Sequence, residues 1–135
     1  MSETSATDQR PVGVGGSKPL APEEFGLILG LASWLMTMSK DHRDLPVSTL
    51  DKRVLPAILL KQFKLIRKDN MPVAFISWAT VSDEVKARID ADPDFAPDLQ
   101  QWRSGPNLVI VECISPFTPV AEVKQHFING LTKTV

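Results

Sequence analysis

Tyrosine is absent from this sequence of 135 residues, which also has only one cysteine and two histidines. The single cysteine, Cys113, excludes an internal disulfide and any metal site built from several cysteines. Nothing therefore points to an oxidising compartment, and we expect a cytoplasmic protein. The sequence lacks a phosphate-binding loop, a dinucleotide fingerprint and the spacing of metal ligands. We expect no bound metal and no bound cofactor.

Long hydrophobic runs and a charge excess are also missing. The longest apolar run, from Gly26 to Met36, is shorter than the ~20 residues that a membrane-spanning helix needs. The N-terminus has no charged segment followed directly by an apolar core, as an export signal would have. The formal net charge is -1, so the molecule as a whole does not attract nucleic acid. We expect neither nucleic-acid binding nor stable membrane insertion.

The composition that remains is that of one globular domain with a polar start. Apolar residues make up 43% and charged residues 23% of the chain, which is too apolar for a disordered protein. Residues 1–20 are rich in serine, threonine and glycine and show no hydrophobic period, so they predict a disordered lead-in. Residues 21–135 are long enough for a single domain.

Hydrophobic spacing and capping residues predict the elements of this domain. A helix should start at Pro22 and bury an apolar stripe that Trp34 extends. A second helical stretch, 48–62, should kink or restart at Pro56. Residues 63–67 and 72–79 are strand-like, with turn residues between them, and predict a hairpin. The mixture of elements indicates the α/β class.

The last third of the chain predicts a helix, a strand and another helix. Ser82 can cap a short helix. The β-branched run in Asn107–Ile114 is typical of a strand covered on both faces. Thr118 and Pro119 should start a final helix, and Gly130 should stop it.

Positive charge is concentrated locally in residues 51–68. Six cations stand there against the single acid Asp51; they are Lys52, Arg53, Lys61, Lys64, Arg67 and Lys68. A run of this kind is usually a solvated face. The alternative is a docking patch for an acidic partner.

Two polar features stand out as candidates for chemistry. His42 lies in a polar loop beside Ser39, whereas His126 has no recognisable partner and should be a surface residue. Glu112 places a carboxylate inside an apolar strand, where an unpaired charge is costly. It either faces water on an edge strand or points into a site and holds a histidine. Cys113 should project to the opposite face from Glu112 and be a packed, inert thiol.

The stretch from Ser33 to Val47 resembles the N-terminal signature of the toxin-activating lysine acyltransferases, which fatty-acylate RTX protoxins. In that family an apolar helix leads into Ser-x-x-His-Arg-x-x-Pro, matched here from Ser39 to Pro46. Further segments follow in the family's order: VLPAI at 54–58, Gln62, MPVAFISWA at 71–79, WRSG at 102–105 and ECISPF at 112–117. Segments in register over so much of the chain make a chance match a poor explanation.

The resemblance implies a fold similar to that of the GNAT acetyltransferases, a mixed α/β (α+β) and mainly antiparallel sheet flanked by helices. It implies transfer of a fatty acyl chain from acyl carrier protein to internal lysines of a protoxin. His42 then corresponds to the catalytic histidine and Ser39 to a nearby serine, which positions His42, donates to the oxyanion or stabilises the loop. Glu112 stands where the family has its catalytic aspartate, and Cys113 where it has tryptophan.

Acyl carrier proteins are strongly acidic, so part of the basic run is predicted to bind the carrier. The residues concerned are Lys61, Lys64, Arg67 and Lys68. Family members typically continue beyond the point where this sequence stops, so we expect a domain shortened at its C-terminus. Two alternatives stay open: a non-catalytic binding protein on the same fold, and a GNAT-like acyltransferase that uses acyl-CoA. A homodimer is compatible with either.

Overall fold

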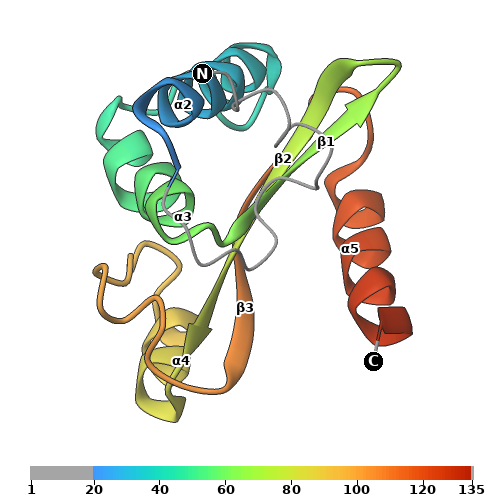
Figure 1. Ribbon diagram of the computed structural model, residues 1–135. Helices are drawn as coiled ribbons and strands as arrows, with labels where there is room; N and C mark the ends of the chain where they lie inside the picture. The colour runs from blue at the N-terminus through green and yellow to red at the C-terminus, as the bar shows by residue number, and fades with distance from the viewer. Residues whose placement is uncertain (1–19, 135) are drawn as a thin grey trace.

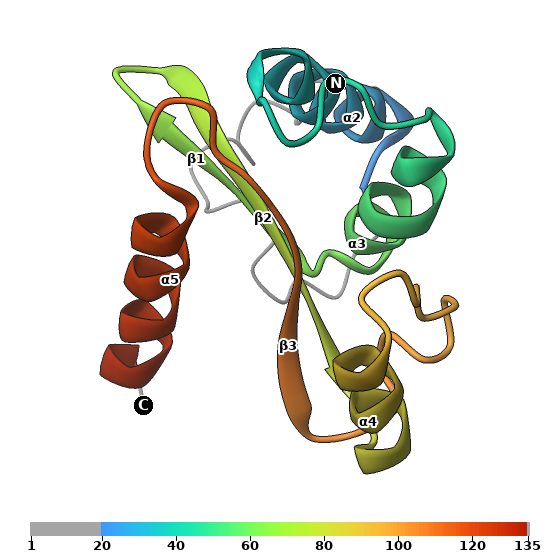
Figure 2. The same cartoon turned by 180° about the vertical axis from the view of Figure 1, so that it is seen from behind.

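Helices lie on both faces of a three-stranded antiparallel sheet in the computed structural model, which describes residues 20–134 (Figure 1). The strand order is β1-β2-β3, with β2 in the centre. Helices α2 and α3 cover one face and α5 covers the other, as the opposite view also shows (Figure 2). The α/β class with an antiparallel sheet is therefore confirmed.

Helix α2 spans Pro22–Met38 and supplies an apolar stripe to the core. Its start is fixed by Pro22 and by Glu24, whose Oε1 accepts a hydrogen bond from the Ala21 amide at 3.0 Å. The buried residues recur at helical spacing, as predicted; they are Ile28, Ala32, Leu35 and Met36. Trp34 does not extend this stripe, because it is 40% exposed on the outer side of the helix.

A short π-helix, η2 (Leu50–Val54), runs directly into α3 (Leu55–Leu60). Pro56 lies in the first turn of α3, the part of an α-helix that tolerates proline best. The predicted restart at this proline is confirmed. The helix ends at Leu60, and the next residue, Lys61, adopts the left-handed conformation at φ 59°.

The hairpin of β1 (Phe63–Lys68) and β2 (Met71–Val81) matches the prediction. Its two turn residues, Asp69 and Asn70, have φ values of 53° and 69°, which suit the tight turns that join twisted antiparallel strands. One face of the hairpin carries Phe63 and Phe75, whose ring centroids lie 5.7 Å apart within the main core.

Helix α4 (Asp83–Ala91) follows β2 and is capped by Ser82, whose Oγ accepts from the Val85 amide at 3.2 Å. The chain then returns through a loop anchored by Trp102, which is fully buried and donates from Nε1 to the Pro97 carbonyl at 3.1 Å. This loop delivers the chain to β3 (Asn107–Ile114).

Strand β3 is an edge strand of the described sheet, with β2 as its only partner there. Val109 and Val111 pack in the main core on the α2 side of the sheet, whereas Ile110 and Cys113 pack in the smaller cluster under α5. The predicted cover on both faces is therefore present, although most residues of the strand are only half-buried. The pairing of β2 with β3 is interrupted by a bulge: Ser77 pairs with Glu112 and Trp78 with Ile110, so Val111 is the extra residue.

Helix α5 (Val120–Thr134) packs on the second face, where the Trp78 and Phe127 ring centroids are 4.9 Å apart. It begins one residue after the predicted Pro119, whose carbonyl accepts from the amides of Glu122 and Val123. The predicted stop at Gly130 is wrong, because the helix continues past it. A glycine lowers helix stability by only about 1 kcal/mol, which is too little to end a helix by itself.

No helix among residues 20–134 combines the length and the apolar content needed to cross a membrane. The predicted lead-in lies outside the described residues apart from Leu20, which packs half-buried against the main core. The likeness to the GNAT fold stays a prediction.

Candidate active site

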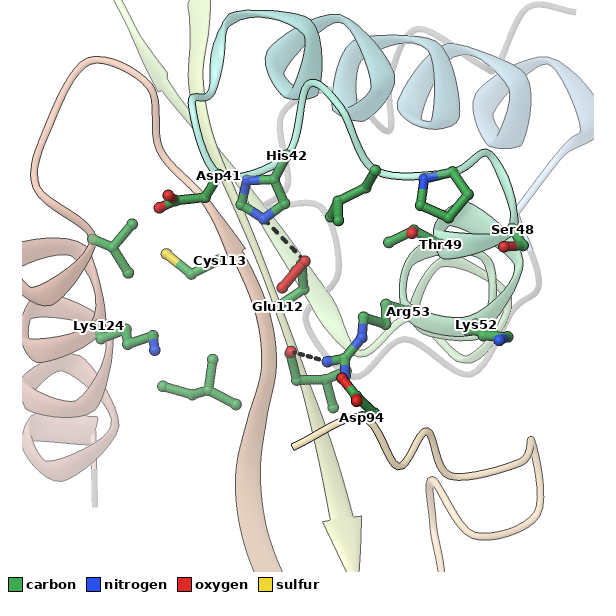
Figure 3. A pocket seen from close by; sticks show the side chains of 15 residues that line it. Asp41, His42, Ser48, Thr49, Lys52, Arg53, Asp94, Glu112, Cys113 and Lys124 are labelled. Atoms are coloured by element: carbon green, nitrogen blue, oxygen red, sulfur yellow. Dashed lines mark hydrogen bonds and ion pairs between the residues drawn. The ribbon is translucent and has the colours of Figure 1, made fainter. Parts of the chain in front are cut away.

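A pocket of about 600 Å³ opens along the edge of β3 and brings together segments that are distant in the sequence. Figure 3 shows the loop after α2 and the start of η2 on one side, and α5 on the other (Figure 3). The floor is formed by residues 110–113 of β3. The ionisable side chains that line the pocket are Asp41, His42, Lys52, Arg53, Asp94, Glu112, Cys113 and Lys124.

A tight turn at the end of α2 fixes His42. Ser39 leaves the helix with extended backbone angles, and its carbonyl accepts from the amides of His42 at 3.0 Å and Arg43 at 2.9 Å. The His42 carbonyl in turn accepts from the Leu45 amide at 3.1 Å. His42 is only 7% exposed, so its ring is held between the turn and the sheet.

Both ring nitrogens of His42 have a partner. Nδ1 lies 2.6 Å from Ser39 Oγ, and Nε2 lies 2.9 Å from Glu112 Oε2. An ionised carboxylate only accepts hydrogen bonds, so Nε2 carries the proton in this contact. In the neutral ring, Nδ1 then accepts from the Ser39 hydroxyl. In the protonated ring, Nδ1–H donates to the same oxygen, because a hydroxyl can take either part.

Glu112 reaches His42 because of its place on β3. It pairs with Ser77, which is fully buried and whose Oγ donates to the Arg53 carbonyl on the helical side of the sheet. The Glu112 side chain points to that same side and is 14% exposed. Both interpretations of the Glu112 carboxylate are partly correct. β3 is an edge strand of the described sheet, as the first requires, but the Glu112 side chain points into the site and accepts a hydrogen bond from His42, as the second requires.

Cys113 projects to the opposite face from Glu112, as predicted, and packs in the cluster under α5. Its thiol has a raised pKa, chiefly because burial disfavours the thiolate, while nearby Lys124 lowers it and Glu112 raises it. Although Cys113 borders the pocket, a thiol that is harder to ionise is a poor nucleophile. His126, the second histidine, is exposed on α5.

The cations predicted to bind a carrier do not line the pocket. Lys61 follows α3, and the other three lie on β1, exposed toward solvent; they are Lys64, Arg67 and Lys68. Two other members of the basic run, Lys52 and Arg53, do border the pocket. No feature of the sequence distinguishes these two residues from the rest of the basic run, since a π-helix is not visible in hydrophobic spacing. Lys124 also lines the pocket, and sequence reasoning did not predict this position either.

Residues 22–134 match the RTX toxin acyltransferase family. The chain belongs to this family. It is 42% identical over 92 residues to the protein-lysine myristoyltransferase HlyC of Escherichia coli, a match that covers 67% of this chain and 51% of the relative. It is 34% identical over 99 residues to the RTX-II toxin-activating lysine-acyltransferase ApxIIC of Actinobacillus pleuropneumoniae, which covers 73% of this chain and 61% of that protein.

The chain is also 32% identical over 111 residues to the protein-lysine myristoyltransferase RtxC of Kingella kingae, a match that covers 79% of this chain and 66% of the relative. The family resemblance inferred from the motif around His42 is therefore confirmed. The chain spans about half to two thirds of the length of these relatives.

Proposed function

We propose that this domain catalyses transfer of a fatty acyl chain from a carrier thioester to the side-chain amine of a protein lysine. The observation that carries the proposal is the 2.9 Å contact between His42 Nε2 and Glu112 Oε2 at the edge of a pocket. Membership of a family whose relatives are named lysine acyltransferases supports it.

The chemistry needs a base. A lysine amine with an ordinary pKa of about 10.4 is almost fully protonated at neutral pH, and freeing it costs about 4.6 kcal/mol. His42 takes up this proton at Nδ1 in our proposal, because Nε2 already carries the proton that it donates to Glu112; the Ser39 hydroxyl, which is bonded to Nδ1, relays the proton. The resulting imidazolium has an acceptor for each N–H group: Glu112 for Nε2–H and the Ser39 oxygen for Nδ1–H. The arrangement therefore stabilises the form of His42 that the reaction produces.

The freed amine attacks the thioester carbonyl, so that a C–N bond forms and the C–S bond breaks. The proton held by His42 passes to the departing thiolate, which leaves as the carrier's free thiol, and the amine nitrogen loses its second proton to solvent as the amide forms. Ser39 is assigned to orienting His42 and relaying the proton rather than to the oxyanion, because its hydroxyl is bonded to Nδ1. The contact between His42 and Glu112 favours an enzyme over a non-catalytic binding protein.

The acyl donor is proposed to be acyl carrier protein, and the acceptor an RTX protoxin or a protein like it. Lys61, Lys64, Arg67 and Lys68 are proposed to attract the acidic carrier by steering. β1 and β3 are two strand spacings apart, about 10 Å, so a carrier docked along β1 would hold its flexible arm close to the pocket. We place the reaction in the cytoplasm, with a homodimer as the proposed assembly.

Transfer can be tested with acyl carrier protein charged with fatty acids of several lengths, acyl-CoA in parallel, and a lysine-bearing protoxin fragment as acceptor. We expect a mass increase of the acceptor with the charged carrier, and none with His42→Ala. His126→Ala is the matched control, because it removes the exposed histidine. Transfer by His42→Ala at the rate of the unaltered protein would refute the assignment of the base.

Reversing Lys61, Lys64 and Lys68 to glutamate tests the carrier patch. We expect weaker carrier binding at low salt, where screening is smallest, with the fold preserved. Reversing Lys86, which lies on α4 and pairs with Asp90, is the control. Unchanged affinity in the triple variant would place the docking surface elsewhere, for instance at Lys52 on the pocket rim.

A further inference from the structure

Arg53 sits on the π-helix that borders the pocket, and its side chain leaves that helix toward β3 (Figure 3). In η2 the amide of Leu55 bonds to the carbonyl of Leu50, which makes a wider turn than an α-helix. A π turn inserts one residue and so changes the direction in which the side chains around it point; such turns occur often at functional sites. Here the turn directs Arg53 across the pocket wall while Val54 stays buried in the core.

The guanidinium of Arg53 holds two backbone carbonyls from different segments. Nη1 donates to the Val111 carbonyl at 3.1 Å, and Nη2 donates to the Pro93 carbonyl at 2.9 Å. Arginine stays charged in proteins and presents its donors in a rigid fork, so it can fix two acceptors at once. One side chain thus ties η2 to β3 and to the loop after α4.

Val111 is the extra residue of the bulge in β3 and directly precedes Glu112. At a bulge the ladder is interrupted, and a carbonyl of the bulged strand needs another donor. Arg53 supplies that donor. The carbonyl of Arg53 is in turn the acceptor for Ser77 Oγ at 3.5 Å, and Ser77 is the residue paired with Glu112. Arg53 therefore contacts two of the residues that neighbour Glu112: Val111 along its strand and Ser77 across it.

We propose that Arg53 is a positioning residue, which locks the Val111 bulge so that the Glu112 carboxylate stays within hydrogen-bond distance of His42. This inference rests on the proposed acyl transfer for its kinetic consequence, but not for its structural one. Among residues 20–134, Arg53 forms no hydrogen bond or ion pair with His42 or Glu112, so it acts through the backbone. A misplacement of about 1 Å at a reacting group can cost ~100-fold in rate.

Arg53→Met tests the inference, because methionine keeps the unbranched stem but loses the charge and both donors. Lys52→Met is the matched control: it removes the same charge from the adjacent residue of the same π-helix, whose side chain is exposed. The primary measurement is nitrogen and proton NMR of the two histidine rings, in which His126, exposed on α5, serves as an internal reference. The Nε2–H proton of His42 should be slow to exchange because it is bonded to Glu112 in a buried contact.

We expect Arg53→Met to broaden or abolish the Nε2–H signal of His42 and to leave His126 unchanged, whereas Lys52→Met keeps both. In the transfer assay, kcat should fall roughly 10- to 100-fold with KM little affected, because ground-state binding is retained. If Arg53→Met does not fold, Arg53→Gln is used; its shorter amide cannot reach both carbonyls. An unchanged Nε2–H signal of His42 in the folded Arg53 variant would overturn the inference. An equal loss of that signal in Lys52→Met would also overturn it. Absence of any acyl transfer in the unaltered protein would instead count against the proposed function, since the NMR measurement still decides the role of Arg53.

Discussion

The charge on Glu112 gives the sharpest test of the proposed base. Glu112→Gln keeps the side-chain length and an oxygen that can accept from His42 Nε2–H, but it removes the negative charge that stabilises the imidazolium. The contact is 2.9 Å long, and the two side chains are 7% and 14% exposed, so solvent screens it little. The substitution therefore removes an electrostatic effect while it changes the shape of the site very little.

The expected loss follows from that geometry. For unit charges centred about 4 Å apart, an effective dielectric constant of about 20 gives an attraction of about 4 kcal/mol. Hydrogen bonds to charged groups contribute about 1.5–3 kcal/mol net. A loss of about 2–4 kcal/mol of imidazolium stabilisation corresponds to transfer that is ~30- to ~1000-fold slower, at about 1.4 kcal/mol per factor of ten.

The assay is a single-turnover transfer from preloaded acyl carrier protein, with the acylated acceptor measured by mass spectrometry. Glu84→Gln, an exposed acid in the first turn of α4, is the control for a change in net charge. Glu112→Asp should retain more activity than Glu112→Gln if the His42 turn can move to meet the shorter side chain. Transfer by a folded Glu112→Gln variant as fast as by the unaltered protein would show that the carboxylate has no part in catalysis.

Two sites outside the proposed base give further tests. Gly105→Ala should lower the thermal midpoint by an amount that corresponds to about 1–3 kcal/mol, because the added Cβ would lie 2.5 Å from the Ser82 Cα; an unchanged midpoint in a thermal melt would contradict this packing. Cys113 should react slowly with a thiol-specific reagent in the folded protein and rapidly in urea, because burial raises its pKa and reduces the thiolate present at neutral pH. Rapid labelling without denaturant would show that the thiol is open to the pocket.

The contact between His42 and Glu112, 70 residues apart in sequence, could be predicted because Glu112 interrupts an apolar strand and His42 matches the family motif. A carboxylate inside an apolar strand needs a reason, and the family motif places a histidine where that reason could lie. The hairpin of β1 and β2 and the restart of the helix at Pro56 were predictable from the local sequence. Arg53 was not, because its role depends on a bulge and a π turn. Neither leaves a hydrophobic period, and a basic run looks the same whether or not one member turns inward.

Gly130 is the opposite case: the sequence contains a local signal for the end of a helix, but the helix does not end there. Its helix continues because α5 is held by contacts earlier along its length, where Val123 and Phe127 pack on the sheet. Tertiary packing of an apolar face contributes more to helix stability than propensity does. The exposed position of Trp34 has a related origin: a helix that covers one face of a sheet buries a single stripe, and Trp34 lies outside it.

The bulge at Val111 lets β3 bury its apolar side chains on both faces of the sheet and also point Glu112 at His42, which strict alternation would not allow. Toward the end of β3, Cys113 packs under α5 and Ile114 packs in the main core, so Glu112 faces the His42 side. Strict alternation from there would turn Val109 toward α5 and Ile110 toward α2, the reverse of what is observed. The extra residue returns Val109 to the main core and Ile110 to the α5 side, while Glu112 stays on the side of His42. A slip of one residue would put Cys113 opposite His42. The register that buries the strand is thus the same register that builds the proposed base, so a variant that loosens the bulge should lose both.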